Sequence, residues 1–265
     1  MAGKFSFLIK SKHSIPMEDR INKILSNPYD PAILDFIYQQ LPDNQKFDNF
    51  RFYYSLMVIK TILTSYYCDL KKIKVLELGG KSFFTDLLKK YVSNIEVHHI
   101  SGGDYRKTIN TSIKYDFVIC MEIIEHLGDL DSDDLGLVCT YTHSGLDGFL
   151  EGIKKTFHSE TRMLISTPNV NTYTSFFNLI QCRNPYVFDK HVHEYGVYEL
   201  KEILERHFQL EYYNTIDLMY RLGYGFDTNF INDIDMLIKK YYPNSAKKNV
   251  GNERGTNNLA ILRLK

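Results

Sequence analysis

The segment IKVLELGG occupies residues 73–80. Its first six residues form a short apolar run that predicts a buried strand, and the run ends in a carboxylate followed by two glycines. The apolar positions of residues 84–91 then recur at helical spacing, so a helix is expected after the turn. Glycines let the backbone approach a ligand at such a turn, and the first turn of the helix presents unpaired N–H groups to it.

Five further strands are predicted by apolar runs outside this unit. They cover residues 95–100, 115–120, 162–166, 210–214 and 259–264, and helices are expected at 148–157, 198–208 and 231–241. Strands that alternate with helices indicate βαβ units, so we expect an α/β, Rossmann-like, mostly parallel sheet with helices on both faces. This domain would span residues 71–265. Residues 1–70 show helical spacing and would form an N-terminal helical cap or lid.

The composition excludes several classes of protein. The chain has 265 residues, of which 44% are hydrophobic, and this excludes a mainly disordered state. Its 32 Lys and Arg balance 32 Asp and Glu, so it lacks the basic charge of a dedicated nucleic-acid binder. Four scattered cysteines indicate neither a zinc knuckle nor a disulfide framework. With no signal peptide and no apolar run long enough to cross a bilayer, we expect a cytoplasmic protein without membrane insertion.

Three more segments of interest follow the glycine turn along the chain. They are YDFVICME at 115–122, LISTPN at 164–169 and HVHEY at 191–195. Taken with IKVLELGG, they resemble the class I S-adenosylmethionine (SAM)-dependent methyltransferases over residues 73–214. The resemblance implies SAM as the cofactor. It also implies a seven-stranded sheet in which the closing strand, 259–264, is reversed.

The resemblance further implies which residues surround the cofactor. They are Glu77, Gly79, Gly80, His99, Asp104 and Met121. By this matching, Glu77 and Gly79 lie under the methionine and ribose parts of SAM, and Met121 lines the same site.

The chain departs from the family pattern in two places. Lys81 and Phe83 stand where further glycines are usual, so the loop must be shaped differently. His98 or His99 stands where an acidic residue usually holds the ribose hydroxyls. We therefore expect Asp104, in the next turn, or a neutral donor to take that role.

The segment MEIIEH at 121–126 holds two glutamates and a histidine. If it is helical, Glu122 and Glu125 lie on one face with His126 beside it. Such an oxygen-rich set with an imidazole suits Mg²⁺ or Mn²⁺. The region resembles metal-dependent O-methyltransferases of the small-RNA 2′-O- and ubiquinone-pathway types, which add a later histidine. That resemblance implies Glu122, Glu125, His126 and His191 as metal ligands, whereas in metal-free relatives the Glu-His pair packs structurally.

The function predicted from these patterns is SAM-dependent O-methylation of a hydroxylated small molecule or an activated sugar, by analogy a surface-polysaccharide precursor. A bound metal would activate the acceptor hydroxyl, and without one His191 or His193 would be the general base. With Glu122, these are the candidate catalytic residues. The alternatives are an RNA 2′-O-methyltransferase and a non-catalytic partner-binding subunit, the latter motivated by Lys81 and Phe83. A dehydrogenase is disfavoured because the G-x-G-x-x-G fingerprint is absent.

Overall fold

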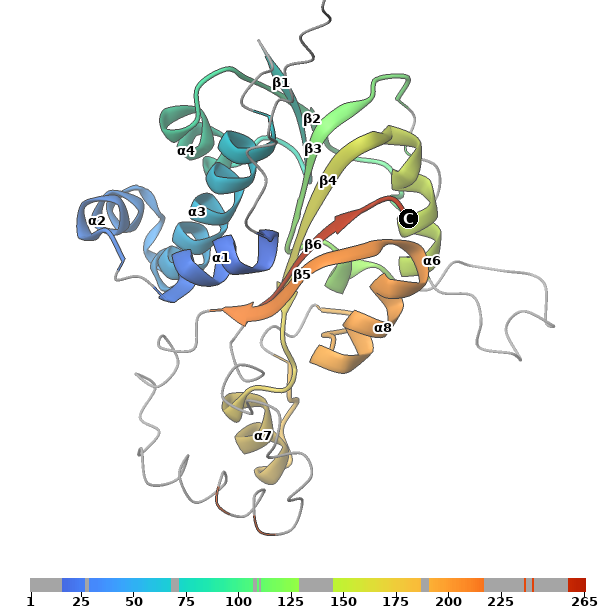
Figure 1. The fold of residues 1–265 in the computed structure, drawn as a ribbon. Helices are drawn as coiled ribbons and strands as arrows, with labels where there is room; N and C mark the ends of the chain where they lie inside the picture. Colours follow the sequence, from blue (N-terminus) through green and yellow to red (C-terminus); the bar gives the residue numbers. More distant parts are fainter. Residues whose placement is uncertain are drawn as a thin grey trace, which may run out of the picture.

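A six-stranded sheet forms the centre of the computed structural model (Figure 1). The structure describes residues 16–26, 29–67, 72–106, 109, 111–128, 145–186, 191–216, 236, 240 and 257–265. The strands are β1 (Ile73–Leu78), β2 (Ile95–Ile100), β3 (Tyr115–Met121), β4 (Phe157–Pro168), β5 (Gln209–Ile216) and β6 (Asn257–Arg263). Their order across the sheet is β2-β1-β3-β4-β6-β5. The first four pair in parallel, and β6 runs antiparallel to both β4 and β5.

All six strands expected from the apolar runs are present, so the α/β class is confirmed. The family resemblance implies seven strands, whereas the described part of the chain holds six strands in a mixed sheet. β4 begins at Phe157, well before the expected 162–166, because polar residues that carry no apolar signal also belong to the strand. The helix expected at 231–241 lies almost wholly outside the described residues.

The helices form a layer on each face of the sheet (Figure 1). One face carries α1 (Met17–Ser26), α2 (Pro31–Gln40), α3 (Asn49–Tyr66) and α4 (Phe83–Tyr91). The other carries α6 (Gly145–Ile153) and α8 (Val197–His207), while α7 (Tyr173–Ile180) lies beyond the end of the sheet. The helix expected at 148–157 is in fact α6, which ends at Ile153 before the short turn η3 (Lys154–Thr156) leads into β4.

Two apolar clusters make up the core, one on each face of the sheet. Successive side chains of a strand point to opposite faces, so Val75 and Phe117 join the cluster of α1–α4. Leu76 and Val118 join the cluster beneath α6 and α8. Strands buried on both faces read as continuous apolar runs, which is why the sequence pattern located them well.

The N-terminal helices share the core of the sheet. In α3, Leu56, Ile59, Ile62 and Leu63 are fully buried in the same cluster as Val75 of β1. Residues 16–26 and 29–67 thus form an integral layer over the sheet, and their role as a lid stays a prediction. Among the described residues, no helix is long and apolar enough to span a bilayer.

Truncating Ile59 tests whether this layer folds together with the sheet. Ile59→Ala should lower the free energy of unfolding by about 2–5 kcal/mol, because it leaves a cavity in the shared core. The exposed Thr64 of the same helix is the control, and Thr64→Ala should change stability by about 0.5 kcal/mol or less. Denaturant unfolding should show a single transition in all three proteins. A separate early transition in Ile59→Ala would mean that the helices are an independent cap.

Candidate functional site

The candidate site lies where three parallel strands end. Glu77 of β1 is in register with Ile119 of β3, and Met121 of β3 is in register with Ser166 of β4. The carboxyl ends of these strands therefore meet at one edge of the sheet. Ligands of open α/β sheets bind at this edge, just beyond the strand ends.

The glycine turn after β1 has the backbone conformation that only glycine adopts without strain. Gly79 and Gly80 have φ values of +89° and +94°. The Gly79 N–H donates to the Ile100 carbonyl at 3.1 Å and lies 3.0 Å from the Tyr105 hydroxyl. Lys81 follows the turn with a normal φ and an exposed side chain that pairs with Asp86. The turn therefore forms with two glycines, and Lys81 does not obstruct it.

The side chains predicted to hold the cofactor already have partners within the chain. Glu77 is buried, and its carboxylate accepts hydrogen bonds from the hydroxyls of Ser82 and Thr85 in and beside the first turn of α4. His99 Nδ1 lies 3.3 Å from Glu77 Oε2. Asp104 accepts two hydrogen bonds from the guanidinium of Arg106, at 2.8 and 2.9 Å. The cofactor roles of Glu77, His99 and Asp104 stay predictions, as do those of Gly79, Gly80 and Met121.

The segment after β3 does not form the helix considered for residues 121–126. Only the single 3₁₀ turn η2 (Ile124–His126) forms, and Glu122 precedes it with φ +54°. Because Glu122 itself is left-handed, no helix continues from it to Glu125, so the two glutamates do not share a helix face. Glu122 turns instead toward Ser166, whose hydroxyl donates to it at 2.9 Å, and toward Asn257, whose amide donates to it at 3.1 Å.

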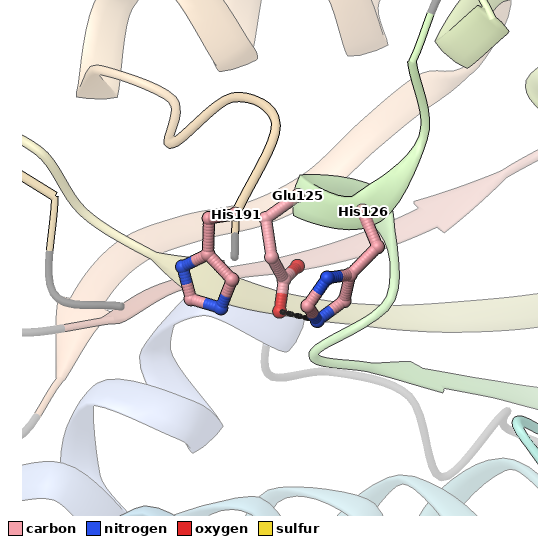
Figure 2. Close-up of side chains that lie close together, drawn as sticks. All are labelled: Glu125, His126 and His191. Carbon is pink, nitrogen blue, oxygen red and sulfur yellow. Dashed lines mark ion pairs between the residues drawn. The ribbon is translucent and has the colours of Figure 1, made fainter. Parts of the chain in front are cut away.

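Glu125, His126 and His191 come together without Glu122. Each offers one ligand atom, and these atoms all lie within 4.8 Å of one another. Figure 2 shows the Glu125 carboxylate between the two imidazole rings, whose centroids are 4.8 Å apart. His126 Nε2 lies 3.9 Å from Glu125 Oε1, and the His126 side chain is 46% exposed, so solvent reaches the group.

Glu125 is the buried centre of this group. Its Oε2 accepts a hydrogen bond from the Thr167 hydroxyl at 2.8 Å. Its Oε1 is buried and accepts no hydrogen bond from the described residues. A buried carboxylate oxygen without a donor is costly unless a cation or a proton meets it.

The backbone and a second carboxylate place His191 against Glu125. The N–H groups of Val192 and His193 donate to the Glu125 carbonyl at 2.9 and 3.1 Å. His191 Nδ1 is 2.6 Å from Oε1 of the buried Glu194. Nε2 of His191, which points toward Glu125 in Figure 2, is then the nitrogen that a cation would meet. A carboxylate on the far nitrogen is the usual way in which a protein orients a metal-binding histidine.

His193 is oriented away from this group by a different carboxylate. Its Nε2 is 2.8 Å from Glu199 Oε1, and its ring packs against Tyr195 with centroids 4.6 Å apart. Glu199 also accepts a hydrogen bond from the Gly196 N–H at the start of α8. The general-base role of His193 stays a prediction.

Burial strongly favours the protonated form of Glu125. It raises the pKa of this carboxyl to about 8, and the charge of Glu122 adds to the effect. Burial also raises the pKa of Glu122, although the nearby Arg51 opposes that shift. At neutral pH Glu125 therefore carries a proton that a divalent cation would displace. One buried carboxylate, two imidazoles and an orienting carboxylate are together a donor set that fits such a cation.

Two residues of this site, Glu194 and Arg51, were not predicted from the sequence. Glu194 stands within HVHEY, and the three-residue spacing from His191 was the available signal. Arg51 belongs to α3, outside the family resemblance, and nothing in the local pattern connects it with Glu122.

Comparisons with known proteins give methyltransferases as structural neighbours. The sequence matches no known family profile and no curated protein. The structure resembles the small RNA methyltransferase HEN1 with a TM-score of 0.49 and 13% identity, over 81% of this chain and 25% of that structure's chain. This chain thus spans a quarter of the HEN1 chain.

Two smaller structures match over nearly their whole length. The plantazolicin methyltransferase BpumL in complex with SAH has a TM-score of 0.49 and 12% identity, over 94% of this chain and 99% of its own. A SAM-dependent methyltransferase from Archaeoglobus fulgidus has a TM-score of 0.45 and 18% identity, over 82% and 96%. All three TM-scores lie below 0.5, with identities of 12% to 18%.

The raised pKa of Glu125 predicts how stability changes with pH. The folded chain holds this proton up to about pH 8, whereas an unfolded chain releases it near the ordinary value of 4.5. This contribution to the free energy of unfolding is present below pH 4.5 and is lost as the pH rises through 8. Glu125→Gln abolishes the titration, so without metal this variant should gain stability relative to the unmodified chain between pH 5 and about 9.

Thermal unfolding measured at pH 5 and at pH 9 checks this expectation. The exposed Glu202 of α8 supplies the control, and Glu202→Gln should follow the unmodified chain at every pH. Added Mn²⁺ should raise the melting temperature of the unmodified chain more as the pH rises, and should leave Glu125→Gln unchanged. A constant difference between the two proteins from pH 5 to 9 would contradict the shift.

The two His-carboxylate pairs give a second, matched prediction. Glu194→Gln should weaken Mn²⁺ binding by about 10- to 100-fold, because it removes the carboxylate that orients His191. Glu199→Gln breaks the equivalent bond to His193 and should leave Mn²⁺ affinity unchanged. Calorimetric titration of the metal-free proteins measures both. Equal effects from the two substitutions would show that Glu194 has no special role.

Proposed function

We propose that this chain is a SAM-dependent methyltransferase that methylates a hydroxyl oxygen with the help of a divalent cation. The observation that carries the proposal is the meeting of Glu125, His126 and His191 at the same sheet edge as the Gly79-Gly80 turn. One half of this edge offers a backbone turn suited to a nucleoside cofactor. The other half offers a donor set suited to Mg²⁺ or Mn²⁺.

The chain's own residues have distinct parts in the proposed reaction. A cation bound by Glu125, His126 and His191 would lower the pKa of an acceptor hydroxyl. SAM would supply the methyl group, and its transfer to the acceptor oxygen would break the carbon–sulfur bond and release S-adenosylhomocysteine. The hydroxyl proton is released to water, which reaches the group at the exposed His126 side chain. The chain's main contribution is to hold the reactants in line.

The acceptor we propose is a hydroxylated small molecule or an activated sugar. Two neighbouring hydroxyls can bind one cation together, which favours a vicinal diol over an isolated hydroxyl. The balanced charge of the chain, 32 basic against 32 acidic residues, supports a small acceptor over RNA. Precursors of surface polysaccharides are the first acceptors to screen.

Calorimetric titration with SAM tests the cofactor part of this proposal. Metal-stripped protein should bind SAM in the micromolar range, with or without added Mn²⁺. An absence of binding in both conditions would overturn the methyltransferase assignment and favour a partner-binding role.

Substitution of His126 tests the metal part separately. His126→Ala should abolish methyl transfer to a diol acceptor while SAM binding persists, because only the cation site is lost. His158→Ala is the matched control, since His158 of β4 pairs with Asp116 of β3 near the other ends of these strands. Full activity of His126→Ala would instead favour the metal-independent mechanism with a histidine base.

A further inference from the structure

Arg51 connects the N-terminal helical layer to the candidate site. The residue is buried in α3, and Asp48 holds it with contacts of 3.0 Å to Nη2 and 3.3 Å to Nε. Its guanidinium lies over the ring of Phe52, 4.6 Å from the centroid. Nη1 reaches to 3.6 Å from Glu122 Oε1. The guanidinium is therefore fixed on its own helix and presents a positive charge to Glu122.

Glu122 is held in place from several directions. Ser166 and Asn257 donate to its carboxylate from β4 and β6, and Asn257 Nδ2 reaches both oxygens, at 3.1 and 3.3 Å. The left-handed backbone at φ +54° directs the side chain toward these donors. A non-glycine residue in this conformation is strained, and such strain persists only where the surroundings hold it. Glu122 thus has its charge partner in Arg51 and lies outside the three-residue group.

We propose that Arg51 is a positioning residue that keeps Glu122 out of the ligand set of the cation. The inference rests on the proposed function. The cation would then be bound by one carboxylate oxygen of Glu125 and one nitrogen each from His126 and His191. Oε1 is the oxygen of Glu125 that would meet it, since Oε1 accepts no hydrogen bond from the described residues and Oε2 accepts one from Thr167.

Three protein ligands determine how the acceptor binds. An octahedral cation held by three protein atoms keeps three positions open, which accommodate both hydroxyls of a vicinal diol and one water. A fourth ligand from Glu122 would leave room for the diol alone and would add a negative charge. The N-terminal layer thereby contributes, through Arg51, to setting the open positions at the site, together with the donors Ser166 and Asn257.

Mn²⁺ titration of the metal-free full chain tests the ligand set. Glu125→Gln should weaken binding by about 100-fold or more, whereas Glu122→Gln should change it by less than about threefold. Arg51→Gln should tighten binding, because it removes a positive charge and frees Glu122 to approach the cation. This tightening should shrink in the Arg51→Gln, Glu122→Gln double variant. A loss in Glu122→Gln as large as that in Glu125→Gln would overturn the inference.

A count of metal-bound water on the unmodified chain and on Glu122→Gln measures the number of open positions directly. The broadening of the Mn²⁺ paramagnetic resonance signal by ¹⁷O-water should indicate three waters in both proteins, and a count of two that rises to three in Glu122→Gln would show that Glu122 is a ligand. Thermal unfolding of each variant shows that it is folded before titration. If the unmodified chain binds no Mn²⁺, the cation site and this inference both fail, while SAM calorimetry still decides the methyltransferase proposal by itself.

Discussion

The site depends on the burial of a single carboxylate at the end of the sheet. Glu125 accepts hydrogen bonds on its carbonyl from Val192 and His193, and on its side chain from Thr167. These contacts join η2, β4 and the segment that carries His191. The other carboxylate oxygen, Oε1, is buried and accepts no hydrogen bond from the described residues. A bound proton or cation would therefore stabilise it. The raised pKa of Glu125 and the orientation of His191 by Glu194 both belong to that local arrangement.

The layer of α1–α4 does more than cover the sheet. Its buried leucine and isoleucine side chains share one core with β1 and β3, so the position of α3 relative to the strand ends is fixed by packing. The guanidinium of Arg51 on this helix is buried and held by Asp48. Arg51 can therefore act on Glu122 from a part of the chain that the methyltransferase resemblance does not include.

The glycine turn shows how a departure from a family pattern is accommodated. Positive φ values occur at Gly79 and Gly80, whereas the next residue, Lys81, has a normal φ and faces solvent. Phe83 packs its ring against Phe52 of α3, with centroids 6.0 Å apart. Larger residues therefore stand after the turn without distorting it, and one of them ties the turn to the N-terminal layer.

The sequence alone determined the strands and the kinds of residue that gather at their ends. Strands buried on both faces leave continuous apolar runs, and polar residues directly after such runs must meet at one edge of a parallel sheet. Glu125 and His126 follow the apolar run of β3, whereas His191 was expected only from the resemblance to metal-dependent O-methyltransferases. Tertiary structure alone decided that Glu122 lies outside the group of Glu125, His126 and His191, because its left-handed backbone and its contacts with Arg51 and Asn257 have no periodic signature. Contacts between residues far apart in the chain depend on how the layers pack, and local sequence patterns do not carry that information.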